Sequence, residues 1–319
     1  MPHGELFVIT TGGPMSQAGH RTASAFCAFV TVLAVESVSR TIPGLSRTVQ
    51  AQSSNQSQAS PQFNAALDQA NRLAKAERWP EAIEAYLRAI RLNPNIAIAH
   101  GNLGHTYSQI GRLQDASASF QRATFLQPDD PIFKYNLGNV YLQLKRLPES
   151  VELFKQVIQL KPNYFEAYND LGNAYAELEK YPEAIDALSA ACRLRPQSAL
   201  AHQNLGVAHY ESGQYEDAIA SLKKAASLDQ SKAESFSDLG LAYLNAHQYR
   251  QAVLALERAG KLAPHDSRTQ FHLGIAYLWA KKRDSFWRQY ALVRTLESDL
   301  ADRLYDAFSQ ARLVVLKQR

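Results

Sequence analysis

The sequence has few cysteines, little net charge and no long apolar run. Only two cysteines, Cys27 and Cys192, occur among 319 residues, which excludes a disulfide framework and a cysteine-based metal site. Cys192 lies in a helical pattern and is interpreted as a small buried apolar residue. The formal net charge of +4 lacks the basic excess typical of a dedicated nucleic-acid binder. The apolar run at residues 24–35 is too short to span a bilayer.

The first 51 residues have features of a targeting segment. The apolar run at 24–35 has the size of a secretory signal core, and both Val35–Ser37 and Val49–Ala51 fit the small-residue spacing of a cleavage site. We therefore expect residues 1–51 to be a signal peptide or a disordered leader. The protein would be exported, to the periplasm or another extracytoplasmic space, if the signal is real, and cytoplasmic otherwise. Residues 52–62 are uncharged, small or amide-bearing, which predicts a disordered linker.

From Phe63 onward the sequence repeats itself every 34 residues. A leucine followed by glycine marks the first half of a unit, and an alanine or serine with a bulky residue four places later marks the second half. The leucines are Leu103, Leu137, Leu171, Leu205, Leu239 and Leu273, and the second-half pairs are Ala82/Tyr86, Ala116/Phe120, Ser150/Phe154, Ala184/Leu188, Ala218/Leu222 and Ala252/Leu256. A spacing of four places both members on one helix face.

Prolines and glycines indicate where the helices of each unit begin, end and meet. Pro80, Pro148 and Pro182 stand where a second helix would start, a position that tolerates proline. Pro94 and Pro128 would stop that helix. The recurring glycine leaves room for two helices to approach, and a larger side chain there should cost roughly 1–3 kcal/mol. The pattern predicts an all-α chain of helical hairpins.

This pattern resembles the tetratricopeptide repeat family. The resemblance implies a right-handed α–α superhelix, a solenoid of about seven helix–turn–helix repeats over residues 63–300, closed by a capping helix at 298–316. The repeats would be 63–96, 97–130, 131–164, 165–198, 199–232, 233–266 and 267–300. The first repeat has Gln69 and Ala70 in place of leucine and glycine, and the last has Phe286 where alanine is usual.

In this family the first helix of each repeat lines a concave groove that binds an extended peptide or a partner's helix. The resemblance places groove residues at the second, fifth, sixth and ninth positions of the repeats, and we select those at the sixth and ninth. These are Asn71, Asn102, His105, Asn136, Asn139, Asp170, Asn173, Asn204, Val207, Asp238 and Leu241. Asparagine both donates and accepts, so a row of asparagines could hold an extended backbone, as in the asparagine ladder of O-GlcNAc transferase repeats, which this row resembles. Alternatively, these side chains are solvated or bond within the stack.

The groove positions change in character along the chain. The first half is rich in amides, and the middle adds acids such as Glu166, Glu211 and Glu234. Apolar surface comes later, from Val207, Tyr210, Leu241 and Leu244. We expect a protein or peptide partner that offers a polar-to-basic segment with an apolar anchor. Nucleic-acid binding and direct membrane insertion are not expected, and neither is a cofactor or a metal.

No catalytic motif is visible, and the protein is not expected to be an enzyme. The histidines form no HExxH pair; His100, His202 and His209 are interpreted as structural, and no phosphate loop or nucleophile elbow occurs. Two further functions stay open. One is an envelope assembly factor that docks a membrane complex through its convex face or C-terminal helix. The other is self-association through residues 298–316, where unpaired Trp279, Trp287 and Phe308 could make a dimer contact.

Overall fold

The computed structural model describes residues 60–317, with side chains up to residue 311. The predicted leader (1–51) and the first part of the predicted linker lie outside these residues. The described chain consists of α-helices without a strand, which confirms the predicted all-α fold. The helices are α3 Pro61–Lys75, α4 Trp79–Leu92, α5 Ala97–Gln109, α6 Leu113–Leu126, α7 Pro131–Gln143, α8 Leu147–Leu160, α9 Phe165–Glu177, α10 Tyr181–Leu194, α11 Ala199–Glu211, α12 Tyr215–Leu228, α13 Ala233–Asn245, α14 Tyr249–Leu262, α15 Ser267–Trp279, α16 Arg283–Leu296 and α17 Ser298–Lys317.

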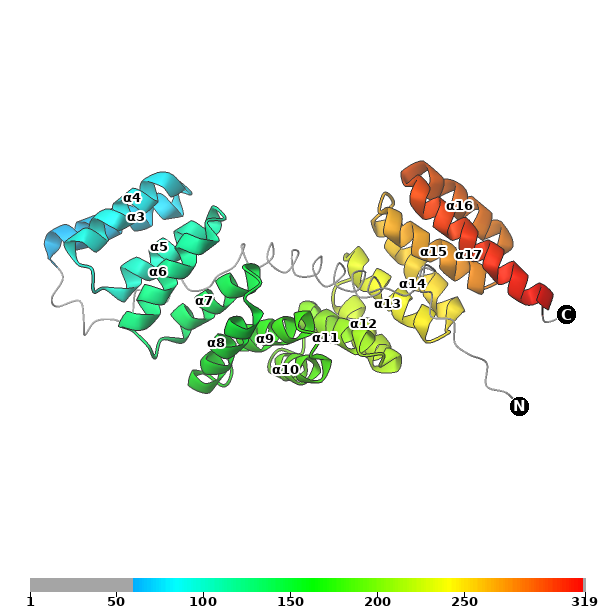
Figure 1. Cartoon of the computed structure of the whole chain (residues 1–319), viewed down its shortest axis with the longest axis horizontal. Helices are drawn as coiled ribbons and strands as arrows, with labels where there is room; N and C mark the ends of the chain where they lie inside the picture. The colour runs from blue at the N-terminus through cyan, green and yellow to red at the C-terminus, as the bar shows by residue number, and fades with distance from the viewer. Residues whose placement is uncertain (1–59, 318–319) are drawn as a thin grey trace. The chain divides into compact units, whose positions relative to one another are not determined.

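The chain divides into two compact units after Lys180. The first unit contains α3 to α9 and the second contains α10 to α17. Within each unit consecutive helices pack against each other, as the hairpins in Figure 1 show. First helices of neighbouring repeats also touch: α3 with α5, α5 with α7 and α7 with α9 in one unit, and α11 with α13 and α13 with α15 in the other. The first helices of a unit therefore form one continuous layer.

A glycine and a small residue bring the two helices of a repeat together. A Cβ atom added to Gly240 would lie 2.4 Å from Leu256 Cγ, whereas one added to Gly104 would lie 3.0 Å from the Phe120 ring. The recurring alanine or serine of the second helices is fully buried in all six repeats that carry it. Close approach at these positions buries the large side chains that stabilise each hairpin.

The turn between the two helices of a repeat has the same backbone conformation throughout the described residues. Its fifteenth position has a positive φ in all seven repeats, yet only two of these residues are glycine. They are Glu77 (φ 57°), Gly111 (φ 74°), Lys145 (φ 59°), Glu179 (φ 58°), Gly213 (φ 78°), His247 (φ 57°) and Lys281 (φ 58°). Side chains other than glycine are mildly strained there.

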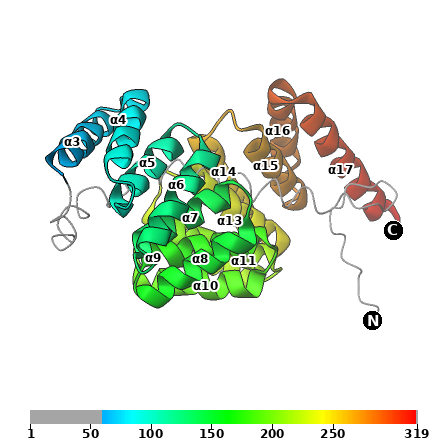
Figure 2. The same ribbon diagram turned by 60° about the vertical axis from the view of Figure 1, so that its left-hand side comes forward.

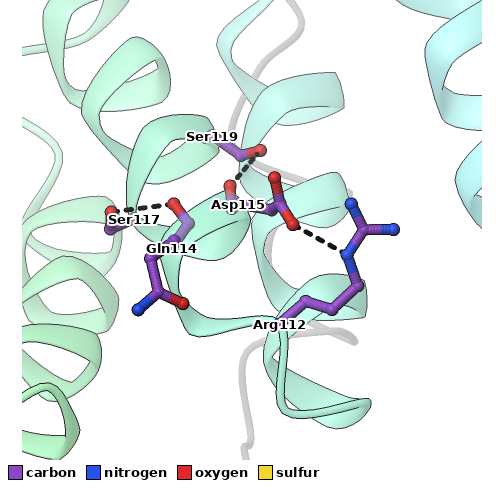
Figure 3. Close-up of polar contacts among 5 residues, drawn as sticks. All are labelled: Arg112, Gln114, Asp115, Ser117 and Ser119. Atoms are coloured by element: carbon purple, nitrogen blue, oxygen red, sulfur yellow. Dashed lines mark hydrogen bonds and ion pairs between the residues drawn. The ribbon is translucent and has the colours of Figure 1, made fainter.

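Short-range polar contacts fix the start of the second helix in the first unit. Arg112 Nε donates to Asp115 Oδ2 at 2.7 Å, and the guanidinium lies over the Tyr107 ring, 4.6 Å from its centroid. Ser119 and Ser117 donate to backbone carbonyls one turn earlier (Figure 3). Equivalent exposed ion pairs join Arg78 to Glu81 and Arg146 to Glu149. Exposed pairs of this kind orient the turn and stabilise the fold little.

The start of the array differs from the sequence-based boundary. Pro61 and Gln62, predicted to belong to a disordered linker, form the first turn of α3. Ser60 Oγ accepts the backbone N–H of Phe63 at 3.2 Å, and Pro61 occupies the first turn, where a missing N–H costs nothing. The cap and the proline extend the helix beyond the repeat pattern.

The last repeat is completed by α17. A Cβ atom on Gly274 would lie 2.6 Å from Leu304 of α17, so this helix fills the space that the second helix fills in other repeats. Phe286, unusual for its position, is 1% exposed and stacks on Phe308 with ring centroids 5.1 Å apart. Figure 2 shows α15, α16 and α17 together. Extra aromatic volume on α16 and a third helix thus end the stack.

Three aromatic residues expected to be unpaired are paired. The rings of Trp287 and Phe308 pack at 4.9 Å, and Trp279 stacks on Tyr249 at 5.9 Å. The prediction that they are unpaired is wrong. Helix α17 folds back onto α16 and pairs Phe308 with Trp287, whereas Trp279 at the end of α15 meets Tyr249 of α14. No helix in the described part of the chain combines the length and apolar character needed to cross a bilayer.

Candidate binding faces on the first helices

The α3–α5 junction joins two predicted groove residues through neutral side chains. Asn71 Oδ1 accepts from Tyr86 Oη at 2.7 Å and from Asn102 Nδ2 at 3.0 Å. Asn102 also lies within hydrogen-bonding reach of Tyr86, whose pKa is raised by burial. Both asparagines are half-buried. These two residues therefore bond within the stack, as the alternative interpretation of the asparagine row expected.

Four further predicted groove residues line α5, α7 and α9. His105, Asn136, Asn139 and Asn173 are all half-buried, so each keeps part of its side chain at the surface. Burial lowers the pKa of His105, which favours a neutral imidazole at pH 7. These side chains present neutral donors and acceptors along the first-helix layer of the first unit.

The α7–α9 junction holds a buried carboxyl group. Tyr135 Oη donates to Asp170 Oδ2 at 2.7 Å, and Asn169 Nδ2 donates to Oδ1 at 3.1 Å. Asn139 hydrogen-bonds to Tyr135 and extends the network to a predicted groove residue. Burial and the nearby charge of Glu166 raise the pKa of Asp170, and the two hydrogen bonds oppose the shift, so that the pKa lies at about 6.

The α11–α13 junction repeats this arrangement in the second unit. Gln203 Nε2 donates to Asp238 Oδ2 at 3.0 Å, and Gln203 Oε1 accepts from Ser235 Oγ at 3.1 Å. Burial and the carboxylates of Glu234 and Glu211 raise the pKa of Asp238, against the hydrogen bond from Gln203, to about 7. A side chain that is only 6% exposed therefore titrates near neutrality.

Both buried carboxyl groups are held in one register. Tyr135 and Gln203 occupy the fifth position of their repeats, and each bonds to the sixth-position aspartate 35 residues later. The fifth position was counted among the groove positions, but the site residues predicted from the sequence were those at positions six and nine, so these two donors were missed. A long polar side chain at position five, with aspartate at position six of the next repeat, is the signal that would have found them.

The remaining predicted groove residues lie in the second unit and are more buried than expected. Asn204 is 3% exposed and Val207 is 6% exposed, while Leu241 is half-buried. Tyr210 accepts a hydrogen bond from Asn245 Nδ2 at 2.9 Å. Of the four residues expected to bring apolar surface, Tyr210, Leu241 and Leu244 are half-buried and retain surface, whereas Val207 is buried.

Histidines outside the groove positions have structural contacts. His100 Nε2 lies 2.9 Å from the carbonyl oxygen of Pro94, and His202 Nε2 lies 3.1 Å from that of Pro196. Each contact satisfies a carbonyl at a turn between repeats. His209 Nδ1 lies 2.9 Å from Gln214 Oε1. Cys192 is half-buried rather than fully buried, and burial raises its pKa to about 11. No cluster of metal-ligating side chains occurs among residues 60–311.

Comparisons with known proteins identify the repeats. Profiles described as TPR repeat and Tetratricopeptide repeat match the chain over most of its described length. The matched segments are 70–111, 105–145, 138–179, 172–213 and 208–246 for the first and 237–284 for the second. No curated protein sequence matches the chain.

Solved structures share the fold. The crystal structure of a protein named MamA is 25% identical, covers 54% of this chain and 94% of its own, and has a TM-score of 0.51. YrrB, described as a TPR protein with an unusual peptide-binding site, is 23% identical over 63% of this chain and 99% of its own, with a TM-score of 0.52. A tetratricopeptide repeat protein from Parabacteroides merdae is 14% identical over 78% of this chain and 100% of its own, with a TM-score of 0.59.

Proposed function

Because the chain belongs to the tetratricopeptide repeat family, we propose that it is a non-catalytic scaffold that binds an extended segment of a partner protein along its first helices. Proteins of this family generally act as interaction scaffolds. Within each unit the first helices form one layer that carries the amide and carboxylate side chains. A layer of donors and acceptors suits recognition of a peptide backbone.

The carboxyl groups at position six support our proposal that the partner segment is polar to basic. Asp170 and Asp238 are bonded to neutral donors, and the charged groups that act on them are other carboxylates. A lysine or arginine side chain from a partner would supply the positive charge that these faces do not supply themselves. Each face would bind such a side chain independently, Asp170 with Glu166 in the first unit and Asp238 with Glu234 in the second.

The neutral part of the first unit supports binding of a peptide backbone. Asn136 and Asn173 occupy α7 and α9 with half-buried side chains, and Asn139 connects this layer to Tyr135. YrrB, which shares the fold, is described as having a peptide-binding site. A short peptide on such a surface would bind at about −8 kcal/mol, which is micromolar affinity.

A substitution pair on the first helices tests the proposal. The full chain would capture a partner, identified by mass spectrometry, and capture would then be repeated with Asn136→Ala/Asn173→Ala. A matched control is Phe125→Ala/Leu254→Ala, which removes side chains that are 73% and 67% exposed on the second helices α6 and α14. We expect the first pair to weaken capture about tenfold or more, as loss of hydrogen bonds worth about 1.4 kcal/mol or more would do.

The exposed side chains of Phe125 and Leu254 favour a second candidate function, docking through the second helices. An envelope assembly factor that docks a membrane complex would use that surface or α17. Loss of capture in Phe125→Ala/Leu254→Ala, with full capture in Asn136→Ala/Asn173→Ala, would establish this function instead. Circular dichroism would show that both variants fold.

Export is part of this second candidate function. The apolar run at residues 24–35 supports secretion. Sequencing the N-terminus of the mature protein tests it: a start just after Ser37 or Ala51 would support export, and an intact leader would contradict it.

A further inference from the structure

Two junctions between first helices hold a carboxyl group that is buried against neutral donors and other acids. We propose that the α7–α9 and α11–α13 junctions are proton-sensitive clasps, each held more tightly when Asp170 or Asp238 is neutral than when it is charged. The proposal concerns the scaffold itself and does not depend on a partner. It follows from where the two carboxyl groups lie and from what surrounds them.

In the second unit, Asp238 has a neutral donor and two acidic neighbours. Gln203 of α11 donates to it at 3.0 Å. The charged groups that act on it are Glu234 of its own helix and Glu211 of α11, and Tyr210 of α11 also faces it. Helices α12, α14 and α15 also pack against α13, and no charged side chain of theirs within the described residues acts on Asp238. A charge there is therefore poorly compensated.

In the first unit, Asp170 has an equivalent environment. Tyr135 of α7 donates at 2.7 Å and Asn169 of α9 donates at 3.1 Å. Glu166 of α9 acts on it, and the phenol of Tyr164, just before α9, also faces it. Helix α8 packs against α9 and contributes no charged group that acts on Asp170 within the described residues. In both units, therefore, an aspartate at position six is buried against neutral donors and has an acidic neighbour.

The direction of the pH effect follows from linkage. An unfolded aspartate has a pKa near 3.8, whereas the folded values are about 6 for Asp170 and about 7 for Asp238. Between these limits the folded state binds more protons than the unfolded state. The contribution of each group to stability is therefore complete below about pH 4. It is lost as the pH rises through 6 or 7, and it stays constant above that.

Hydrogen–deuterium exchange of the full chain at pH 5 and pH 8, corrected for the intrinsic pH dependence of exchange, tests the two clasps separately. The variants are Asp170→Asn and Asp238→Asn, which keep the acceptor for Tyr135 or Gln203. A matched control is Asp68→Asn, an exposed aspartate at the same repeat position. From pH 5 to pH 8, protection of the wild type relative to the variant should fall about tenfold or more at α7–α9 and about 100-fold at α11–α13.

Two results would overturn the proposal. One is a protection ratio that does not change with pH, or that changes equally in Asp68→Asn. The other comes from the wild-type chain and needs no variant to fold: the side-chain carboxyl carbons of Asp170 and Asp238 can be titrated by NMR. Midpoints well above that of Asp68 support the clasps, and midpoints equal to it contradict them.

Discussion

The α3–α5 junction and the α11–α13 junction have the same backbone arrangement and opposite chemistry. In the first, Asn102 at position six donates to Asn71, and the network with Tyr86 contains only neutral groups. In the second, Asp238 at position six accepts from Gln203 beside two other acids. Asn102 donates to Asn71 within the stack without any charge, whereas a buried aspartate needs a proton or an external cation.

This difference separates two kinds of position. The small residue of the second helix packs the hairpin, whereas position six determines which polar groups a junction contains. The small residue of the second helix is fully buried in both regions, at Ala82 and at Ala252. Position six changes without disturbing the hairpins. The chemistry of recognition can therefore vary along the chain while the helix packing stays constant.

Asn102→Asp should have the largest effect on stability, because it places the aspartate of the α11–α13 junction into the α3–α5 junction. The new carboxylate would face Asn71 Oδ1 in a half-buried site, so two hydrogen-bond acceptors would stand where a donor and an acceptor now bond. We expect the free energy of unfolding to fall by about 2–3 kcal/mol at pH 8. The loss should be much smaller at pH 4, where the protonated side chain can donate. Urea unfolding followed by circular dichroism at both pH values measures this difference, and an equal loss at both would show that charge is not the cause.

The two tyrosines give the next largest effect. Tyr135 Oη donates to a carboxyl group and Tyr86 Oη donates to an amide. Burial of the charge weakens the α7–α9 junction as a whole, but the hydrogen bond from Tyr135 itself is stronger when Asp170 is charged. Tyr135→Phe should therefore cost about 2 kcal/mol above pH 6, and Tyr86→Phe about 1 kcal/mol. Only the first cost should increase as the pH rises from 5 to 8. Thermal unfolding of the two variants between pH 5 and pH 8 measures these costs. If the stability loss changed with pH by the same amount in both, the difference between the charged and the neutral acceptor would be refuted.

Gly240→Ala and Gly104→Ala compare the helix packing of the two regions. The added Cβ would lie 2.4 Å from Leu256 in the first variant and 3.0 Å from Phe120 in the second. Overpacking should destabilise Gly240→Ala by about 1–2 kcal/mol. Gly104→Ala should be nearly neutral, because the better helix propensity of alanine, about 1 kcal/mol, offsets the tighter contact. Chemical unfolding curves of both variants decide this, and equal costs would contradict the packing argument.

The turns should show the smallest effect. Each region has one glycine and one larger residue with a positive φ at position fifteen: Gly111 and Glu77, and Gly213 and His247. Glu77→Gly and His247→Gly should each stabilise the chain by up to about 1 kcal/mol, and Gly111→Ala and Gly213→Ala should destabilise it by a similar amount. Melting temperatures of the four variants test the pairing; opposite signs in the two regions would show that the turns are not equivalent.

The repeat period allowed the helices to be predicted, but not the contacts between repeats. The residue types at the positions of Leu239, Gly240 and Leu256 recur every 34 residues, because each repeat needs the same packing. The hairpins could therefore be placed from the sequence. The bond from Gln203 to Asp238 joins residues from different repeats, and the period alone does not show which side chains reach each other. The pairing of Trp287 with Phe308 was missed because it depends on how α17 folds back.

Binding to a partner segment tests the central claim, that carboxylates on the first helices recognise a cationic segment. Isothermal titration calorimetry would compare the captured partner's binding segment on wild type, Asp170→Asn/Asp238→Asn and the control Asp68→Asn at pH 8. We expect the double variant to bind about tenfold or more weakly, a loss of about 1.4 kcal/mol or more, and the control to bind as wild type does. Unchanged affinity in the double variant would contradict the account.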